Sequence, residues 1–228
     1  MTYKAFLLDI EGTVCPISFV KDVLFPYFAR QIPDLVQKSD ASKSPVIRAT
    51  LDKFNISDPA LLEAHIINLV KNDVKDPVLK ELQGYVWDAG YKSGEIKAPV
   101  YQDAIEFIKR SPVVYIYSSG SVKAQKLLFG HVADPRDPSV GIDMQPYIKG
   151  YFDINTSGKK TEDSSYTNIL KDIGLGGDAS SVLFLSDNPL ELIAAEKAGL
   201  STGLALREGN APVENKDQYK CYENFDSL

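Results

Sequence analysis

Residues 5–13 read AFLLDIEGT, and this short stretch is the best starting point for predicting the architecture of the chain. Four successive apolar residues without alternation are typical of a strand covered on both faces, as in a parallel sheet. Asp9 follows directly, and Glu11 falls on the same side two residues later. Gly12 lets backbone amides approach an anion. The stretch therefore predicts a buried strand whose end presents two carboxylates.

Further apolar runs recur along the chain and alternate with helical patterns. We predict strands at 113–117, 152–154, 182–185 and 202–205, and helices at 121–129, 161–173 and 189–198. Helix start and stop signals support the three helices, with Ser121 as a cap, Pro189 at a first position and Gly174 and Gly199 as stops. The alternation predicts an α/β fold with a doubly wound parallel sheet.

About a hundred residues separate the first two predicted strands, which is too long for an ordinary crossover connection. Helical spacing occurs at 19–30, 59–75 and 77–89, and Gly90 is interpreted as the stop of the last of these helices. We therefore predict a helical cap at 15–99, inserted into an α/β core formed by 1–14 and 100–228. The polar stretches 37–45 and 135–145 are predicted to be loops.

Composition narrows the choice of partner. Lys and Arg total 25 and Asp and Glu total 31, so the net charge is 25 − 31 = −6, and no basic run suggests nucleic acid or a membrane surface. The start of the chain does not resemble a signal peptide, and Cys15 and Cys221 have no disulfide or zinc spacing. We expect a cytoplasmic monomer, with nuclear presence left open, that acts on a small phosphorylated substrate.

Three more motifs stand at ends of predicted strands, where an open α/β sheet forms its ligand crevice. The turn 118–121, SSGS, offers hydroxyls and helix amides to a phosphate, although it is also common as a plain helix cap. The motif 158–162, GKKTE, offers a lysine, although paired loop lysines are more often only solvated. Asp187 suits magnesium, and Glu191 lies one turn into the next helix, where it could support the metal or the helix N-terminus.

Together these residue types suit phosphoryl transfer. Asp9 is the candidate nucleophile and a metal ligand, and Glu11 helps the metal or moves protons. A lysine from 158–162 neutralises the phosphate, but sequence chemistry alone does not separate Lys159 from Lys160. A bound divalent cation would offset the repulsion between an acidic protein and a phosphorylated substrate.

With the four motifs in this order, the chain resembles the haloacid dehalogenase superfamily over 9–191. It departs from the general pattern at Glu11, where an aspartate is usual. DIEGT, YSSGS, QKLLFG and FLSDNPLE together resemble the enolase-phosphatase (acireductone synthase) family of methionine salvage. The resemblance implies Mg2+ bound by Asp9, Glu11 and Asp187, catalysis by Asp9, Glu11 and Lys160, and substrate contacts from Ser118, Ser119 and Lys160. It also implies supporting roles for Gly12, Thr13 and Glu191.

The family substrate implied by this resemblance is 2,3-diketo-5-methylthiopentyl 1-phosphate, which is enolised and then dephosphorylated to the acireductone. Three alternatives stay open: a phosphatase of the same superfamily with another small ester, a non-catalytic phosphate-binding module, and a phospho-acceptor domain. The long helical insertion argues against the last of these. His65, His131, Cys15 and Trp87 are expected to serve packing or helix ends rather than chemistry.

Overall fold

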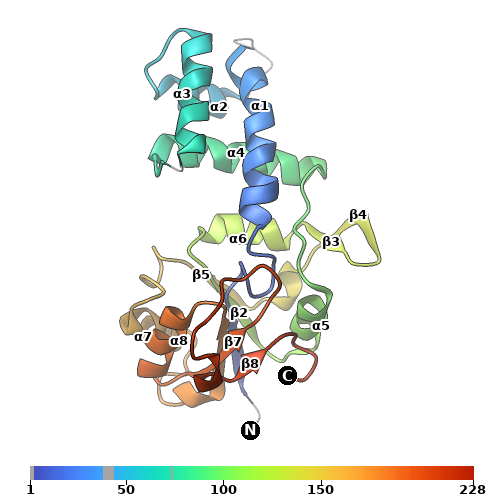
Figure 1. Ribbon diagram of the computed structural model, residues 1–228, viewed down its shortest axis with the longest axis vertical. Coiled ribbons are helices and arrows are strands. Elements are labelled where there is room, and N and C mark those ends of the chain that lie inside the picture. Colours follow the sequence, from blue (N-terminus) through green and yellow to red (C-terminus); the bar gives the residue numbers. More distant parts are fainter. Residues whose placement is uncertain (1–2, 38–43, 73) are drawn as a thin grey trace. The chain divides into compact units, whose positions relative to one another are not determined.

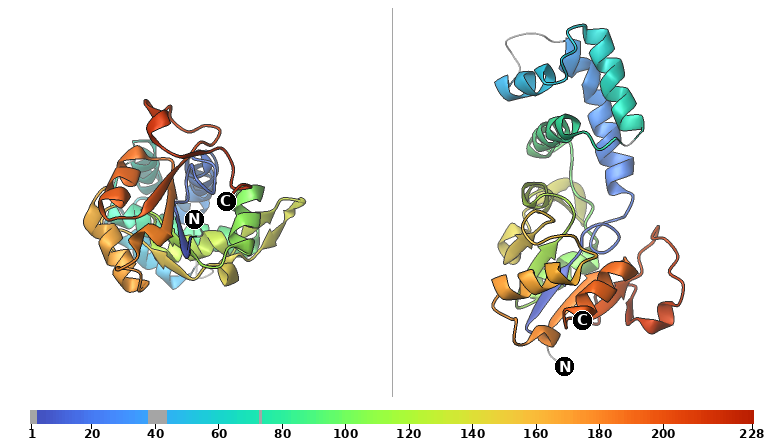
Figure 2. Two further views of the ribbon diagram at one scale, coloured as in Figure 1. Left: turned by 90° about the horizontal axis from the view of Figure 1, so that it is seen from below. Right: turned by 90° about the vertical axis from the view of Figure 1, so that its left-hand side faces the viewer.

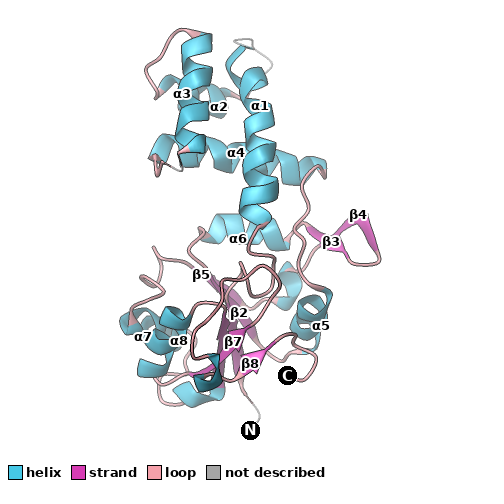
Figure 3. Cartoon of the chain, in the orientation of Figure 1, coloured by secondary structure: helices cyan, strands magenta, loops and turns pink. Residues whose placement is uncertain are grey.

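The computed structural model describes residues 3–37, 44–72 and 74–228 (Figure 1). The chain divides into two compact units, Met1–Phe19 with Lys97–Leu228 and Val20–Ile96. We call them the sheet unit and the helical unit; Figure 3 shows that strands are confined to the first. The helical unit, Val20–Ile96, begins and ends a few residues inside the cap predicted from sequence at 15–99. A cap role for the helical unit stays a prediction.

The sheet unit is built on six parallel strands in the order β5-β2-β1-β6-β7-β8. They are β1 Ala5–Leu8, β2 Val114–Tyr117, β5 Gly150–Phe152, β6 Val182–Ser186, β7 Ser201–Ala205 and β8 Cys221–Tyr222. Leu7 on β1 lies opposite Tyr115 and Phe184, so the first strand is central. Because all pairings are parallel, the carboxyl ends of the strands share one edge. The predicted doubly wound parallel sheet is confirmed.

Alternation along β1 sends successive side chains into cores on opposite faces of the sheet. Leu7 joins the core formed with Tyr166 of α7 and Leu192 of α8. On the other face, the Phe6 ring packs edge-on against Phe107 of α5, with ring centroids 4.8 Å apart. The flanking helices are α5 Gln102–Arg110, α6 Val122–Phe129, α7 Asp163–Asp172 and α8 Pro189–Lys197 (Figure 2). Helices on both faces explain why β1, β2 and β6 are almost continuously apolar.

Several predicted bounds were wrong. The third predicted strand lies at Gly150–Phe152 rather than 152–154, because Asp153 already begins a turn. The region 135–145 is not a loop, since β4 Asp137–Ile142 pairs with β3 Val132–Asp134 in a hairpin. α5 and β8 were not predicted. The polar stretch 37–45 falls largely on residues outside those described.

The helical unit contains the short π-helix Val20–Leu24 followed by α1 Phe25–Gln37, α2 Pro45–Asp52, α3 Pro59–Lys71 and α4 Pro77–Ser93. Asp58 and Asp76 cap α3 and α4 by accepting backbone N–H groups of Leu61 and Leu79. α4 passes through the predicted stop at Gly90 and ends at Gly94, which has φ 80°. Among the described residues, no helix is long and apolar enough to cross a membrane.

Candidate active site

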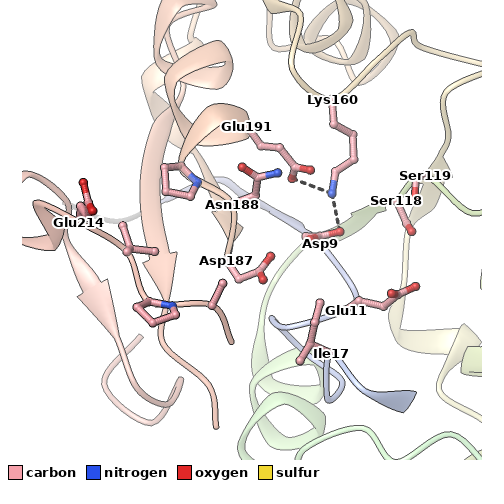
Figure 4. A pocket seen from close by; sticks show the side chains of 14 residues that line it. Asp9, Glu11, Ile17, Ser118, Ser119, Lys160, Asp187, Asn188, Glu191 and Glu214 are labelled. Atoms are coloured by element: carbon pink, nitrogen blue, oxygen red, sulfur yellow. Dashed lines mark ion pairs between the residues drawn. The ribbon is translucent and has the colours of Figure 1, made fainter. Parts of the chain in front are cut away.

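A cavity of about 500 Å³ opens at the carboxyl edge of the sheet, and all residues that line it belong to the sheet unit (Figure 4). These residues lie in the segments that follow β1, β2, β5, β6 and β7. The lining side chains are Asp9, Glu11, Ile17, Ser118, Ser119, Lys160, Asp187, Asn188, Pro189, Glu191, Ala211, Pro212, Val213 and Glu214. Seven of the nine residues predicted from sequence to be catalytic, substrate-binding, metal-binding or supporting line this cavity. The other two, Gly12 and Thr13, lie in the adjoining backbone of the loop that follows Asp9.

Lys160 makes the central ion pairs of this cavity. Its Nζ lies 2.5 Å from Asp9 Oδ1 and 2.7 Å from Glu191 Oε2. The Lys160 side chain is only 8% exposed, so these contacts are largely shielded from water. Burial lowers the pKa of Lys160, but the two carboxylates raise it by more, and the net direction is upward. Lys160 therefore stays charged beside the proposed nucleophile.

Aromatic hydroxyls hold the backbone that carries Lys160. Tyr166 Oη donates to the Lys160 carbonyl at 2.7 Å, and Tyr117 Oη donates to the Gly158 carbonyl at 2.7 Å. Lys159 instead points outward, with a side chain 77% exposed and 3.6 Å from Glu162. The structure thus separates the two neighbouring lysines, which the sequence chemistry alone did not.

The carboxylates of the cavity raise one another's pKa. Burial, Asp9 and Glu191, in that order, raise the pKa of Asp187 to about 7. Burial and then Asp9 raise the pKa of Glu11, while Lys160 opposes them. Glu191 follows the same pattern, although it also accepts a hydrogen bond from Ser186 at 2.8 Å. The cavity holds more negative charge than Lys160 neutralises, so it favours a proton or a cation.

Four hydrogen bonds hold the turn after β2 and the start of α6. Ser118 Oγ accepts from the Gly120 N–H at 3.2 Å, and Ser121 caps α6 by accepting from Ala124 N–H at 3.3 Å. The Gln125 amide donates to the carbonyls of Gly120 and Phe152, both at 2.8 Å. Ser118 is buried and Ser119 is exposed, and both face the cavity. A fixed turn of this kind presents hydroxyls without having to be ordered by a ligand.

The donor set fits a hard divalent cation in part. Asp9 and Asp187 are close enough for the Asp9 charge to raise the pKa of Asp187, and carboxylates are the ligands that magnesium prefers. Glu11 lies differently, because its carboxylate points toward the Ser118–Ser119 side and away from Asp187 (Figure 4). Within 3–37, 44–72 and 74–228, no three His, Cys, Asp or Glu side chains already converge as a metal set.

The remaining candidates lie outside this cavity. Cys15 is buried and free, and burial and then Glu11 raise its pKa, so it is no poised nucleophile. His65 packs edge-on against Phe54 at 5.6 Å, and His131 Nδ1 lies 2.9 Å from the Leu127 carbonyl. Trp87 donates its indole N–H to the Leu24 carbonyl at 2.9 Å. None of the four lines the cavity.

Residues 206–214 after β7 were missed. Four of them line the cavity, while Arg207 and Asn210 bond to the loop that follows Asp9. The strand predicted at 202–205 is the one signal for this segment, because the carboxyl end of a parallel strand lies at the ligand edge of the sheet. Its residue types, however, carry no signature of phosphoryl transfer.

Comparison with known proteins agrees with this geometry. A family model for haloacid dehalogenase-like hydrolases matches residues 3–199. The crystal structure of CbbY from Rhodobacter sphaeroides in complex with phosphate superposes with a TM-score of 0.62 at 15% identity, covering 100% of this chain and 96% of that one, which supports the fold alone. The chain belongs to the haloacid dehalogenase-like hydrolases.

Full-length relatives narrow the family further. Enolase-phosphatase E1 of Saccharomyces cerevisiae (strain YJM789) is 63% identical over 227 residues, covering 99% of this chain and 98% of the relative. Enolase-phosphatase E1 of Kluyveromyces lactis is 58% identical, with both chains fully covered. The crystal structure of UTR4 protein from S. cerevisiae matches with a TM-score of 0.94 at 62% identity over both whole chains. Within the hydrolases, the chain belongs with the enolase-phosphatases.

Proposed function

We propose that this chain transfers the phosphoryl group of a small phosphate ester first to Asp9 and then to water. The observation that carries the proposal is the buried contact between Lys160 Nζ and Asp9 Oδ1 at 2.5 Å, inside a cavity at the carboxyl edge of the sheet. The ammonium group favours the ionised carboxylate, which is the form that can act as a nucleophile.

The chemistry has two displacements. An Asp9 carboxylate oxygen bonds to phosphorus as the ester P–O bond breaks, and the leaving oxygen takes up a proton. Water then attacks phosphorus, the bond to Asp9 breaks, and inorganic phosphate leaves. The raised pKa of Glu11 keeps a proton on this group at higher pH than on a free glutamate, which suits it to protonate the leaving oxygen.

Charge neutralisation falls to Lys160 and to a cation. Lys160 offsets the negative charge of the substrate phosphate. Ser118 and Ser119 donate hydroxyl hydrogen bonds to the phosphate oxygens. Asp9 and Asp187 would hold Mg2+, whereas the carboxylate of Glu11, the third ligand implied by the resemblance, points away from Asp187 (Figure 4). When bound, Mg2+ supplies positive charge to the phosphate and to the crowded carboxylates.

We assign the substrate as 2,3-diketo-5-methylthiopentyl 1-phosphate, with enolisation before dephosphorylation, in methionine salvage. The support is the name shared by relatives 54–63% identical over nearly the whole chain. The base for enolisation is unassigned, and Glu11 is a candidate. We place the helical unit as a cap that takes part in substrate choice. The cytoplasmic, monomeric state also stays a proposal.

Substrate profiling with Mg2+ tests the assignment. The diketone phosphate, supplied anaerobically, should yield acireductone and inorganic phosphate in equal amounts. Phosphate without acireductone would favour a phosphatase for another small ester. If neither this substrate nor an aryl phosphate releases phosphate with Mg2+ present, the chain is a non-catalytic phosphate-binding module.

A further inference from the structure

Four backbone N–H groups of the loop after β1 are satisfied within the loop itself. Gly12 N–H donates to the Cys15 carbonyl at 2.8 Å, and the N–H groups of Thr13, Val14 and Cys15 donate to the Ile10 carbonyl at 3.0 to 3.2 Å. We call residues 9–15 the nucleophile loop. Its carbonyl groups at Gly12 and Thr13 point the other way and accept hydrogen bonds from a segment almost two hundred residues later.

Two side chains of the loop that follows β7 make these bonds. Arg207 Nε donates to the Thr13 carbonyl at 2.9 Å, and Asn210 Nδ2 donates to the Gly12 carbonyl at 2.8 Å. Asn210 Nδ2 also donates to the Ala205 carbonyl at 3.2 Å, which ties the same amide to the end of β7. The nucleophile loop is thus fastened to the sheet from its carbonyl side.

Arg207 itself is rigidly held. Its side chain is only 5% exposed, and its Nη2 lies 2.7 Å from Asp103 Oδ2. Its guanidinium lies over the rings of Tyr101 and Phe225, 4.5 and 4.4 Å from their centroids. Nη1 donates to the Glu223 carbonyl at 3.0 Å. A planar guanidinium fixed at all three nitrogens gives one direction to the bond with Thr13.

Gly12 is the residue of the nucleophile loop that lies between Asn210 and the cavity residue Asp187. It has φ +72°, a left-handed conformation. A Cβ added there would lie 2.7 Å from Asp187 Cγ and 2.9 Å from Asn210 Oδ1. The backbone of the nucleophile loop therefore fits between Asn210 on one side and Asp187 on the other. A shift of Asn210 would change the spacing between the Asp9 loop and Asp187.

We propose that Arg207 and Asn210 are positioning residues for phosphoryl transfer, which place the nucleophile loop relative to Asp187. This inference rests on the proposed function. Neither side chain is among the residues that line the cavity. Their effect is on geometry, and misplacement of a reacting group by about 1 Å can cost on the order of a hundredfold in rate.

The test compares Asn210→Ala and Arg207→Lys with Arg136→Lys and Asn72→Ala. Arg136 Nη2 lies 2.8 Å from Asp134 Oδ2 in the β3–β4 hairpin and Asn72 Nδ2 donates to the Asn68 carbonyl at 2.8 Å, so each control loses a bond away from the nucleophile loop. With an aryl phosphate and Mg2+, both positioning variants should lower kcat by about tenfold to a hundredfold while KM changes little. Both controls should keep the wild-type kcat. Urea unfolding of each protein shows whether it is folded, and Asn210→Ala decides the question if Arg207→Lys does not fold.

Hydrogen exchange of the peptide spanning 9–15 gives a readout that needs no substrate. Asn210→Ala should speed exchange there and leave peptides of α3 unchanged. A folded Asn210→Ala protein with wild-type kcat, or with unchanged exchange in 9–15, would overturn the inference, as would equal losses of kcat in the controls. A wild-type protein without phosphatase activity would instead overturn the proposed function, and exchange would still decide whether Asn210 holds the loop.

Discussion

Lys160 keeps its positive charge although its side chain is buried, because two carboxylates compensate for the loss of contact with water. Its ammonium group contacts Asp9 and Glu191, and Tyr166 and Tyr117 fix the backbone around it. Removal of the amine would leave two buried carboxylates without a cation, as well as a phosphate with less compensation. Lys159 has no such environment, since its side chain is largely in water.

Lys160→Ala should therefore lower kcat/KM by the equivalent of about 2 to 4 kcal/mol, because charge that develops in the transfer would be less well neutralised. Lys159→Ala is the matched control and should stay close to wild type. Steady-state kinetics of the two variants side by side make the comparison. A large defect in Lys159→Ala with a nearly silent Lys160→Ala would reverse the assignment.

Asp9→Asn should abolish turnover while the fold is retained, because an amide is a poor nucleophile and its charge is lost next to Lys160. Rapid-quench trapping of a phosphorylated protein would detect the intermediate in wild type and not in the variant. Circular dichroism of both proteins controls for folding. Wild-type activity in a folded Asp9→Asn protein would exclude the covalent route.

Asp187 should make the metal-free protein less stable as pH rises. Its pKa is about 7 in the folded state against 3.8 for the unperturbed group, so between these values the folded state binds the additional proton. Stability from this group is therefore full below about 4 and lost as pH rises through about 7. Urea unfolding in chelator should show this fall in wild type and in the exposed control Asp172→Asn.

In Asp187→Asn the fall should be smaller, because only Glu11 and Glu191 of these three groups then keep raised pKa values. Mg2+ added at pH 8 should stabilise this variant far less than wild type, because a carboxylate ligand is missing. Isothermal titration of Mg2+ into both proteins measures the difference directly. Equal affinities would place the metal elsewhere.

Among the elements, α4 shows that a glycine within a helical pattern need not end the helix. Gly90 was interpreted as a stop, but the helix continues to Ser93. A Cβ at position 90 would lie 2.7 Å from both Tyr27 Cζ and Ile96 Cδ1, so the glycine permits close packing inside the helical unit. Gly84 lies in the same helix, and a Cβ there would have no neighbour within 4 Å.

Gly90→Ala should destabilise the helical unit by about 1 to 3 kcal/mol, since overpacking exceeds the gain in helix propensity. Gly84→Ala should instead stabilise it by up to about 1 kcal/mol, because only propensity changes. Trp87 is the single tryptophan and lies in this unit, so its fluorescence during urea unfolding reports both effects. Equal responses of the two variants would contradict the packing argument.

The sequence predicted the elements whose signal is local. The nearly continuous apolar runs that became β1, β2 and β6 were found because burial on both faces leaves few polar positions. β8 escaped because two residues carry no periodicity, and the β3–β4 hairpin because all of β4 but Ile142 is exposed. α5 does carry a local signal, since Ala104, Ile105, Phe107 and Ile108 are buried at helical spacing, so this helix was predictable from the sequence.

In the site, too, the residues that were predicted are those with a local sequence signal. Strand-end position and residue type were enough to identify Asp9, Ser118 and Asp187. The roles of Arg207 and Asn210 depend on contacts across 194 and 198 residues of sequence, and an arginine or asparagine in a loop has no local feature that reveals them. Long-range hydrogen bonds to backbone carbonyls are therefore the part of the site that only the structure supplies.

For the whole molecule, the described cavity draws every lining residue from the sheet unit, whereas the helical unit has its own packing of α1 with α3 and α2 with α4. The chain carries a net charge of −6, and five carboxylates line the cavity together with the single ammonium group of Lys160. A cation that binds there is linked to the folding of the sheet unit, because ligands that bind only the folded state stabilise it.

Mg2+ at about a hundredfold its Kd should add about 2.7 kcal/mol to the stability of the sheet unit. Hydrogen exchange should show this as stronger protection of amides in β1 and β6, which lie next to Asp9 and Asp187, while amides of α3 keep their metal-free rates. Asp187→Ala is the control in which Mg2+ should protect neither region. If α3 gains as much protection as β1 and β6 in wild type, the two units open together, and binding in the sheet unit then stabilises the helical unit as well.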